Sequence, residues 1–332
     1  MSRKPSVWQR VGDPEKGFSY LRTNGKPLRS KHALKRIDRL AIPPAWSDVE
    51  IATTAGAKVQ ATGYDAAGRK QYIYSEGHVE RRSRRKYRKL LPFARTLPRL
   101  REVTNEHLQQ QGLGRERVLA TVVRLMSRAF FRVGSERYAV ENKTFGIATL
   151  QKKHLEIRGN DLVFHYAGKS SVDQRRVVAD TPLVEVLEEI LELPGKRLFR
   201  YRRNDGKVVD VTASDVNDYL QEILGEKYTS KDIRTWGGTV RAATILADLG
   251  PPKNKTEAKK NATLTCKLVS SELGNTPSVC RSAYIHPAVI DRYAKGKTIE
   301  PLMRAEPRPV EANSPQYYAE EAALMRFLDK WG

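Results

Sequence analysis

The sequence predicts an α+β protein with two domains, a β-rich domain over residues 1–90 and a larger, mainly helical domain over residues 91–332. Short stretches in which apolar and polar residues alternate, with turn residues between them, fill most of the first 90 positions. Beyond about residue 100, apolar residues recur at helical spacing, except near residues 154–180, where the period is two. The helical domain is therefore expected to hold a three-stranded sheet.

The β-rich domain is expected to be a small twisted sheet with hairpins and one helix. That helix should begin after Ser30, because Leu34, Ile37 and Leu40 follow at helical spacing, and the prolines of "IPPAW" end it. The expected strands are "FSYLRT", which an "NGK" turn follows, "VEIAT", "KVQATGYD" and "KQYIYSE".

The larger domain is expected to open with a helix over residues 115–134. A short helix, "SERYAVEN", and the strands "HLEIRG", "LVFHYAGK" and "RRVVAD" come next. A helix, "PLVEVLEEILEL", follows, and another begins at Thr212, where Asp215 completes a capping box. Long helices are expected over about 230–249 and 254–273. The final helix, "QYYAEEAALMRFLDKW", follows a proline-rich stretch.

The chain carries 60 Lys and Arg against 38 Asp and Glu, a formal net charge of +22. This excess favours a polyanionic partner, because basic side chains that neutralise phosphates release condensed counterions. An anionic membrane is the alternative, but no apolar run approaches the roughly 20 residues that span a bilayer. The N-terminus lacks the apolar segment of a signal peptide, and Cys266 and Cys280 form no metal-ligand or redox pattern. A cytoplasmic protein with no membrane partner is expected.

The basic residues cluster at "RRSRRKYRKLL", residues 81–91. Such a run is a solvated helix face, a nuclear-import patch, or a helix or linker that faces phosphates. The charge of the whole chain favours the last interpretation.

Metal and nucleotide chemistry find no support in the sequence. The six histidines are scattered without an H-x-x-x-H motif, and no tight cluster of carboxylates occurs. A two-metal nuclease is therefore not expected. No phosphate-loop motif occurs either, so ATP-driven chemistry lacks support. No metal site and no cofactor are expected.

Several polar residues are candidates for a site, although each alone is ambiguous. Arg132, in "AFFRVG", is either an arginine at the surface boundary or one whose fork binds a ligand phosphate. Lys169, in "YAGKSS", lies at a predicted hairpin tip, where a lysine serves solubility or reaches into a site as a proton donor. Arg234 precedes Gly237 and Gly238, which allow close backbone approach.

The loop "GNTPSVCRSAYIHP" contains two further candidates. Gly274 can end the preceding helix, Asn275 follows in ordinary turn chemistry, and Thr276 with Pro277 can begin another helix. This short helix presents Tyr284 just ahead of a proline. A tyrosine near a helix is usually a packing residue, so spacing alone leaves its role open.

Taken together and in order, these segments resemble the type IB DNA topoisomerases, in particular the compact poxvirus-type enzymes and their bacterial relatives. The resemblance extends over about residues 17–296 and implies the catalytic fold that this family shares with tyrosine recombinases. The segments that carry it are "ATGYDAAGRKQYIY", "FFRVGSERYAVENKTFGIATLQKKHLEI", "FHYAGKSSV", "KDIRTWGGT" and "LGNTPSVCRSAYIHP".

The resemblance assigns a role to each candidate. It makes Tyr284 the nucleophile, Arg132 and Arg234 the catalytic arginines, and Lys169 the lysine of the β-hairpin. Asn275 falls where poxvirus members have histidine, so it can donate a hydrogen bond to a phosphate oxygen but carries no charge. The DNA-binding residues that the resemblance implies are Arg69, Lys70, Gln71, Tyr72, Tyr74 and Tyr138.

The implied reaction agrees with these residue types. Attack by Tyr284 on a phosphodiester gives a 3′-phosphotyrosine and a free 5′-hydroxyl. Two arginines and an amide can bind the charge on the non-bridging oxygens without a metal, while Lys169 protonates the leaving oxygen. Religation then needs no ATP, and swivelling between the two steps relaxes supercoils. The implied partner is double-stranded DNA, clamped by a monomer between its two domains in the cytoplasm, associated with the nucleoid.

Two alternatives remain open at this point. A tyrosine recombinase shares the fold and the Arg-Lys-Arg-Tyr set, but such enzymes usually carry H-x-x-R around the second arginine. Here the sequence is "KDIR", with Lys231 in the place of the histidine. A DNA-binding protein without catalytic activity would also explain the charge of +22, but not the full set of catalytic positions.

Overall fold

The structure is a computed structural model that describes residues 6–225, 227–304 and 314–332. The chain forms two compact units, Met1–Lys86 and Tyr87–Gly332, each with its own hydrophobic core. The change from one unit to the next falls within helix α2 (Glu76–Arg88). The sequence predicted a division near residue 90.

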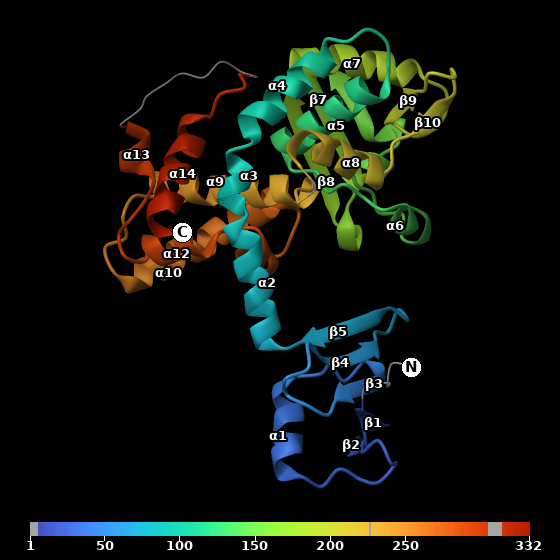
Figure 1. Ribbon diagram of the computed structural model, residues 1–332, viewed down its shortest axis with the longest axis vertical. Helices are drawn as coiled ribbons and strands as arrows, with labels where there is room; N and C mark the ends of the chain where they lie inside the picture. Colours follow the sequence, from blue (N-terminus) through green and yellow to red (C-terminus); the bar gives the residue numbers. More distant parts are fainter. Residues whose placement is uncertain (1–5, 226, 305–313) are drawn as a thin grey trace. The chain divides into compact units, whose positions relative to one another are not determined.

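The first unit is a five-stranded antiparallel sheet with helix α1 (Lys31–Arg39) against one face (Figure 1). The side chain of Ser30 accepts a hydrogen bond from the backbone N–H of Ala33, which confirms the predicted N-cap. Ile37 of α1 packs in the core with Ile51 of the sheet. In spatial order the strands are β2 (Gly17–Leu21), β1 (Val7–Asp13), β3 (Ser47–Ala52), β4 (Val59–Tyr64) and β5 (Lys70–Tyr74).

Strand β1 was not predicted. Its sequence, VWQRVGD, lacks a regular alternation of apolar and polar residues, so periodicity gives no signal. It forms because it pairs on both sides, with β2 through Val11 opposite Ser19 and with β3 through Trp8 opposite Ile51. Tertiary pairing therefore decides the conformation of this segment.

The second unit is mainly helical. Its helices are α3 (Leu90–Ala94), α4 (Leu97–Leu108), α5 (Arg115–Ala129), α6 (Glu136–Glu141), α7 (Thr181–Glu192), α8 (Ala213–Leu224), α9 (Ser230–Asp248), α10 (Lys255–Leu273), α11 (Pro277–Ala283), α12 (Pro287–Tyr293), α13 (Glu300–Arg304) and α14 (Ala319–Trp331). Its strands are β6 (Leu155–Arg158), β7 (Asp161–Ala167), β8 (Asp173–Ala179), β9 (Arg200–Arg202) and β10 (Val208–Asp210).

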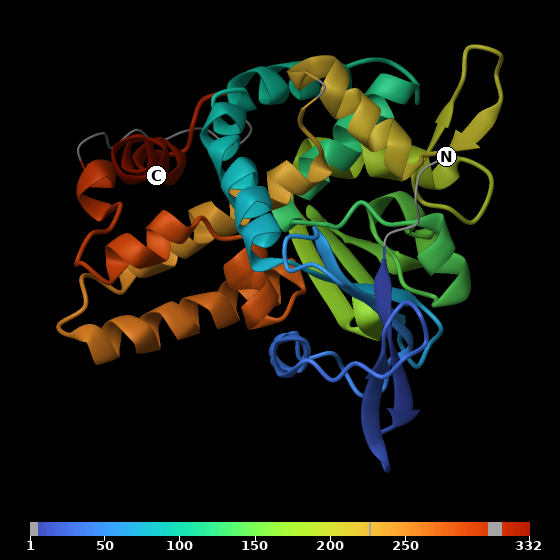
Figure 2. The ribbon, with the colours of Figure 1, turned by 60° about the horizontal axis from the view of Figure 1, so that its bottom comes forward.

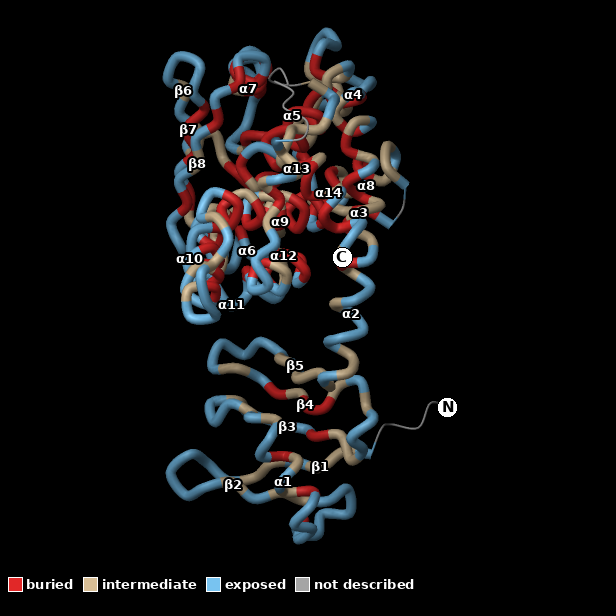
Figure 3. The backbone as a smooth tube through the Cα atoms, turned by 90° about the vertical axis from the view of Figure 1, so that its left-hand side faces the viewer, coloured by how far each residue is buried: buried red, intermediate tan, exposed pale blue. Residues whose placement is uncertain are grey.

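Helix α5 lies at the centre of this unit and is buried on nearly every side, whereas α2 is largely exposed (Figure 3). Two arginines of α5 are buried with it, and each is neutralised by a carboxylate. Arg117 donates to both oxygens of Glu189 at 2.7 Å, and Arg124 donates to both oxygens of Asp180 at 2.8 and 2.9 Å. Bidentate pairing of this kind offsets the cost of burying a guanidinium.

Strands β6, β7 and β8 form the predicted three-stranded antiparallel sheet. The hairpin of β9 and β10 was not predicted, because strands of three residues are too short to show a period. Helices α3 and α4 were not predicted as separate elements either. The final helix begins at Ala319 rather than at Gln316, since Tyr318 is its N-cap.

Helices α9, α10 and α11 position the predicted catalytic residues that belong to the C-terminal part of the chain. Helix α10 packs along α9, and α11 folds back onto α10 (Figure 2). Gly274 ends α10 in the left-handed region, at φ 62°, and the Thr276 side chain caps α11, as predicted. The predicted capping box of Thr212 and Asp215 is also confirmed.

Candidate active site

Four of the five residues predicted to be catalytic come together, three of them at or just after helix ends and one within a helix. Arg132 follows the end of α5, and Arg234 lies in the first half of α9. Asn275 follows the end of α10, and Tyr284 is the residue that ends α11. Lys169 is exposed in the short connection between β7 and β8. In the described part of the chain, no hydrogen bond or ion pair joins Lys169 to the other four.

Arg132 binds the turn that follows α10. Its Nη2 donates to the carbonyl oxygen of Gly274 at 2.6 Å and to Oδ1 of Asn275. Burial lowers the pKa of the Arg132 guanidinium, and the nearby Tyr284 acts in the opposite direction. The hydrogen bond from Arg132 therefore fixes the orientation of the Asn275 amide.

Arg234 lies between the C-terminal ends of two helices and is only 3% exposed. Its Nη1 donates to the carbonyl of Phe130, which ends α5, and its Nη2 donates to the carbonyl of Leu273 at 2.8 Å. Helix C-termini leave such carbonyls unpaired and carry partial negative charge, so they suit a buried cation. Burial lowers the pKa of Arg234 to about 10, while Tyr284 counteracts this shift.

The backbone of Tyr284 is held directly against α9. Its carbonyl accepts a hydrogen bond from Oγ1 of Thr239 at 3.2 Å. A Cβ atom at Gly238 would lie 2.9 Å from that carbonyl oxygen, and one at Gly237 would overlap the ring of Phe130. The close backbone approach predicted for these two glycines is confirmed at Gly238, whereas Gly237 makes room for a side chain instead. The Tyr284 ring then lies over Arg234, with 5.2 Å between Cζ and the ring centre.

The site contains buried N–H groups without acceptors. Among the described residues, the buried side-chain nitrogens that lack a hydrogen-bond partner are Nε of Arg234, Nδ2 of Asn275 and Nε of Arg176. No carboxylate forms an ion pair with Arg132 or Arg234 within the same residues. Buried donors are almost always satisfied, so these N–H groups are available to an acceptor with several oxygens. A phosphate group has this chemistry.

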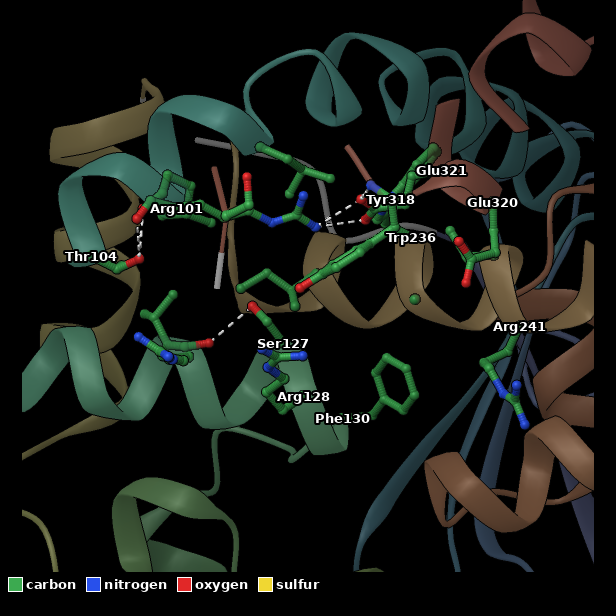
Figure 4. A pocket seen from close by; sticks show the side chains of 18 of the residues that line it. Arg101, Thr104, Ser127, Arg128, Phe130, Trp236, Arg241, Tyr318, Glu320 and Glu321 are labelled. Carbon is green, nitrogen blue, oxygen red and sulfur yellow. Dashed lines mark hydrogen bonds and ion pairs between the residues drawn. The ribbon is translucent and has the colours of Figure 1, made fainter. Parts of the chain in front are cut away.

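A pocket lies beside this cluster, and side chains around it hold helix α9 in place (Figure 4). Phe130 and Trp236 line it, and it contains none of the five residues predicted to be catalytic. Glu321 accepts two hydrogen bonds, one from Nη2 of Arg101 at 2.8 Å and one from Nε1 of Trp236 at 3.0 Å. These bonds hold α9 against α4 and α14, and thereby fix the helix that carries Arg234.

The residues predicted to bind DNA in the first unit lie on or beside β5. The rings of Tyr72 and Tyr74 are side by side, 6.2 Å apart, and Tyr72 is 48% exposed. Gln71 points to the other face and donates to Oδ2 of Asp65 at 2.9 Å, which also forms an ion pair with Arg69 at 2.8 Å. The hydrogen bonds from Arg69 hold the pKa of Asp65 down at about 2.

Lys70 and Tyr138 complete the predicted DNA-binding set. The Nζ atom of Lys70 lies 5.8 Å from the centre of the Tyr64 ring. Tyr138 lies on α6 of the second unit and is 50% exposed. Both side chains are thus available at the surface of their units.

No group of three or more His, Cys, Asp or Glu side chains that could hold a metal occurs in the described part of the chain. Residues 6–225, 227–304 and 314–332 include no helix with the length and apolar character needed to cross a membrane.

Comparison with known families identifies the class of enzyme. Residues 75–305 match the family described as "Eukaryotic DNA topoisomerase I, catalytic core". Residues 17–65 match "Bacterial DNA topoisomerase IB, N-terminal domain". Both descriptions fall within the type I DNA topoisomerases, enzymes that act on DNA.

Individual relatives narrow the assignment. The chain is 30% identical over 286 residues to DNA topoisomerase 1B of Acanthamoeba polyphaga mimivirus. The matched region covers 84% of this chain and 85% of the relative. The chain is 26% identical over 238 residues to DNA topoisomerase 1B of Vaccinia virus (strain Copenhagen), covering 69% of this chain and 70% of the relative. The protein belongs to the type IB DNA topoisomerase family, as the resemblance predicted.

Proposed function

We propose that the protein relaxes supercoiled DNA by cutting one strand transiently, letting it swivel and resealing it, without ATP or a metal ion. The observation that carries this proposal is the set of unpaired buried donors on Arg234 and Asn275, beside the tyrosine that would attack. Their N–H groups have the chemistry that binding to phosphodiester oxygens would use.

In the cleavage step, the phenolic oxygen of Tyr284 forms a bond to the phosphorus, and the bond from phosphorus to the 5′-oxygen breaks. The product is a 3′-phosphotyrosyl link and a free 5′-hydroxyl. Arg132, Arg234 and Asn275 donate hydrogen bonds to the non-bridging oxygens, where charge increases in the transition state. Because they are already fixed by the ends of α5 and α10, little reorganisation is needed during the reaction.

The leaving 5′-oxygen is strongly basic, so it needs a proton, and Lys169 is the proposed donor. Ser170 and Ser171, which follow it, both have positive φ values, 62° and 56°, so this connection departs from regular strand geometry. Lys169 is exposed in the structure. We propose that the hairpin brings it to the scissile bond when DNA binds. Religation reverses these steps, so the energy of the broken bond is retained.

The first unit is proposed to be a DNA-binding domain, corresponding to the predicted residues 1–90. Tyr72, Tyr74 and Gln71, with Arg69 and Lys70, would contact the duplex, and Tyr138 would contact it from the catalytic unit. The net charge of +22 supports binding to a polyanion. We further propose that a single chain engages one duplex with both units, and that it acts in the cytoplasm on nucleoid DNA.

A plasmid assay tests the proposal. The protein is incubated with negatively and, separately, positively supercoiled plasmid in EDTA without ATP. Relaxation of both substrates is expected, because no step uses a metal or a nucleotide. Denaturing electrophoresis of the same reactions should show protein bound covalently to a 3′ end. An absolute requirement for Mg²⁺ or ATP would contradict the proposed mechanism.

A further inference from the structure

Arg176 lies in the same cluster as the predicted catalytic arginines, although sequence analysis gave it no role. It is on β8, directly across from Phe164 of β7, in the hairpin that carries Lys169. Side chains of β8 alternate between the core and solvent: Gln174 and Val178 are buried, while Arg175 is exposed. Arg176 therefore faces inward.

The side chain of Arg176 is only partly satisfied. Its Nη2 donates to Oε1 of Gln174 at 2.6 Å, while its Nε is buried and has no hydrogen-bond partner among the described residues. Gln174 is itself buried and lies directly against Gly274, since a Cβ atom at that glycine would overlap its Oε1 atom. Gln174 thus orients Arg176 beside the turn that carries Asn275.

The positive charge of Arg176 adds to that of the other two arginines. As a like charge, Arg176 contributes to lowering the pKa of both Arg132 and Arg234, although burial is the main cause in each. Burial raises the pKa of the Tyr166 hydroxyl, and all three guanidinium groups act against that rise, Arg176 through a hydrogen bond as well as through its charge. The three cations therefore all lie near this hydroxyl.

The two buried arginines of α5 differ from Arg176 in their partners. Arg117 and Arg124 are buried and each has a carboxylate partner in bidentate geometry. Within the described residues Arg176 has no carboxylate partner and keeps an unused Nε. A guanidinium needed only for packing would leave that donor and that charge uncompensated, at considerable cost.

We propose that Arg176 is a further catalytic residue, which binds a non-bridging oxygen of the phosphate that Tyr284 attacks. Its Nε–H would donate to this oxygen, and its charge would add to that of Arg132 and Arg234. The proposal rests on the proposed cleavage reaction and adds a third arginine to it. No bond is made or broken at Arg176, so its contribution is to stabilise negative charge.

The test compares Arg176→Gln with Arg175→Gln, which removes the same charge from the neighbouring, exposed position. Cleavage is measured in a single turnover on a duplex oligonucleotide, as covalent protein–DNA adduct. Arg176→Gln should slow cleavage by about 10²-fold, the usual effect of removing one donor to a developing oxyanion. Arg175→Gln should stay within about threefold of the unaltered protein, and Arg176→Lys, which keeps the charge, should fall between them.

A second substrate separates contact with the phosphate from a structural role. In a methylphosphonate at the scissile position, one non-bridging oxygen is replaced by a methyl group and the negative charge is lost. If Arg176 binds that charge, the decrease in cleavage rate caused by Arg176→Gln should shrink to about tenfold or less on this substrate. An equal decrease in cleavage rate on both substrates would show that Arg176 only supports the fold and would overturn the proposal. Normal cleavage by Arg176→Gln would overturn it as well.

Failure of the underlying reaction gives a different result. If the unaltered protein formed no covalent adduct, the proposed function itself would be wrong. If it formed the adduct and Arg176→Gln matched it in rate, only the role of Arg176 would be lost. Circular dichroism and thermal melting of each variant report whether it is folded. Should Arg176→Gln not fold, the comparison of the two substrates is made with Arg176→Lys.

Discussion

The guanidinium of Arg234 lies against the face of the Tyr284 ring, 5.2 Å from Cζ to the ring centre. Arg234 is held by carbonyl groups at the ends of α5 and α10, and the tyrosine is held by Thr239 and by its close approach to Gly238. The contact is therefore fixed from both sides. Replacing the tyrosine hydroxyl should leave the geometry of the site nearly unchanged.

We expect Tyr284→Phe to abolish cleavage while DNA affinity stays within about threefold, because only the nucleophilic oxygen is lost. Plasmid relaxation and covalent adduct formation measure the first effect, and fluorescence anisotropy with a labelled duplex measures the second. Residual relaxation by the purified variant would mean that another residue is the nucleophile.

Lys169→Ala should lose most of the cleavage rate on an ordinary duplex, because the 5′-oxygen would leave without a proton. A duplex with a sulfur at the bridging 5′ position expels a much weaker base. The defect of Lys169→Ala should shrink sharply on that substrate, whereas the defect of Arg234→Ala should persist, since Arg234 acts on the non-bridging oxygens. Equal defects of Lys169→Ala on the two substrates would assign the proton to a different residue.

Asn275→Asp should reduce cleavage more than Asn275→Ala. In either variant the Nδ2 donor is lost, but the aspartate would also place a negative charge beside Arg132, where Oδ1 of Asn275 now accepts a hydrogen bond. That charge would neutralise the arginine and repel the phosphate. Single-turnover adduct formation by both variants provides the measurement. A faster reaction for the aspartate variant would show that Asn275 does not face the phosphate.

Replacing both Tyr72 and Tyr74 by Ala should weaken duplex binding or slow cleavage without unfolding the protein. Their rings share one face of β5, while Ile73 between them packs towards the core. The fold depends on Ile73, so the tyrosines can be removed at small cost to stability. Affinity and adduct formation are compared with the unaltered protein, and unchanged values for both would refute the proposed role of this strand.

Stability should fall in mild acid because of His154. Burial, in part against the ring of Phe145, lowers the pKa of His154 to about 4, compared with about 6.5 in an unfolded chain. Below pH 6.5 the unfolded state therefore binds a proton that the folded state does not bind until about pH 4. The free energy of unfolding should decrease as the pH falls through this window.

Urea unfolding at pH 7 and pH 5 measures this effect. His154→Gln removes the titrating group, so the loss of stability between these two pH values should be smaller in the variant. The same loss in both proteins would show that His154 titrates normally in the folded state.

Much of the local structure follows from short stretches of sequence. Ser30, Thr212 and Thr276 begin helices, and Gly274 ends one, because caps and left-handed turns depend on single side chains and their nearest neighbours. The elements that were missed lack such local signals. Strand β1 has no alternation and exists through pairing on both sides, and β9 and β10 are too short to show a period.

Composition and the order of the motifs were enough to predict the family, the caps, the three-stranded sheet and the residue types of a phosphate-binding site. Which of those residues meet depends on how the helices pack. Arg132 reaches Gly274, 142 residues away in the chain, because the ends of α5 and α10 lie together around Arg234. Arg176 became a candidate in the same way, because its lack of a carboxylate partner and its unused Nε, among the residues that the structure describes, are properties of its surroundings and not of its own segment.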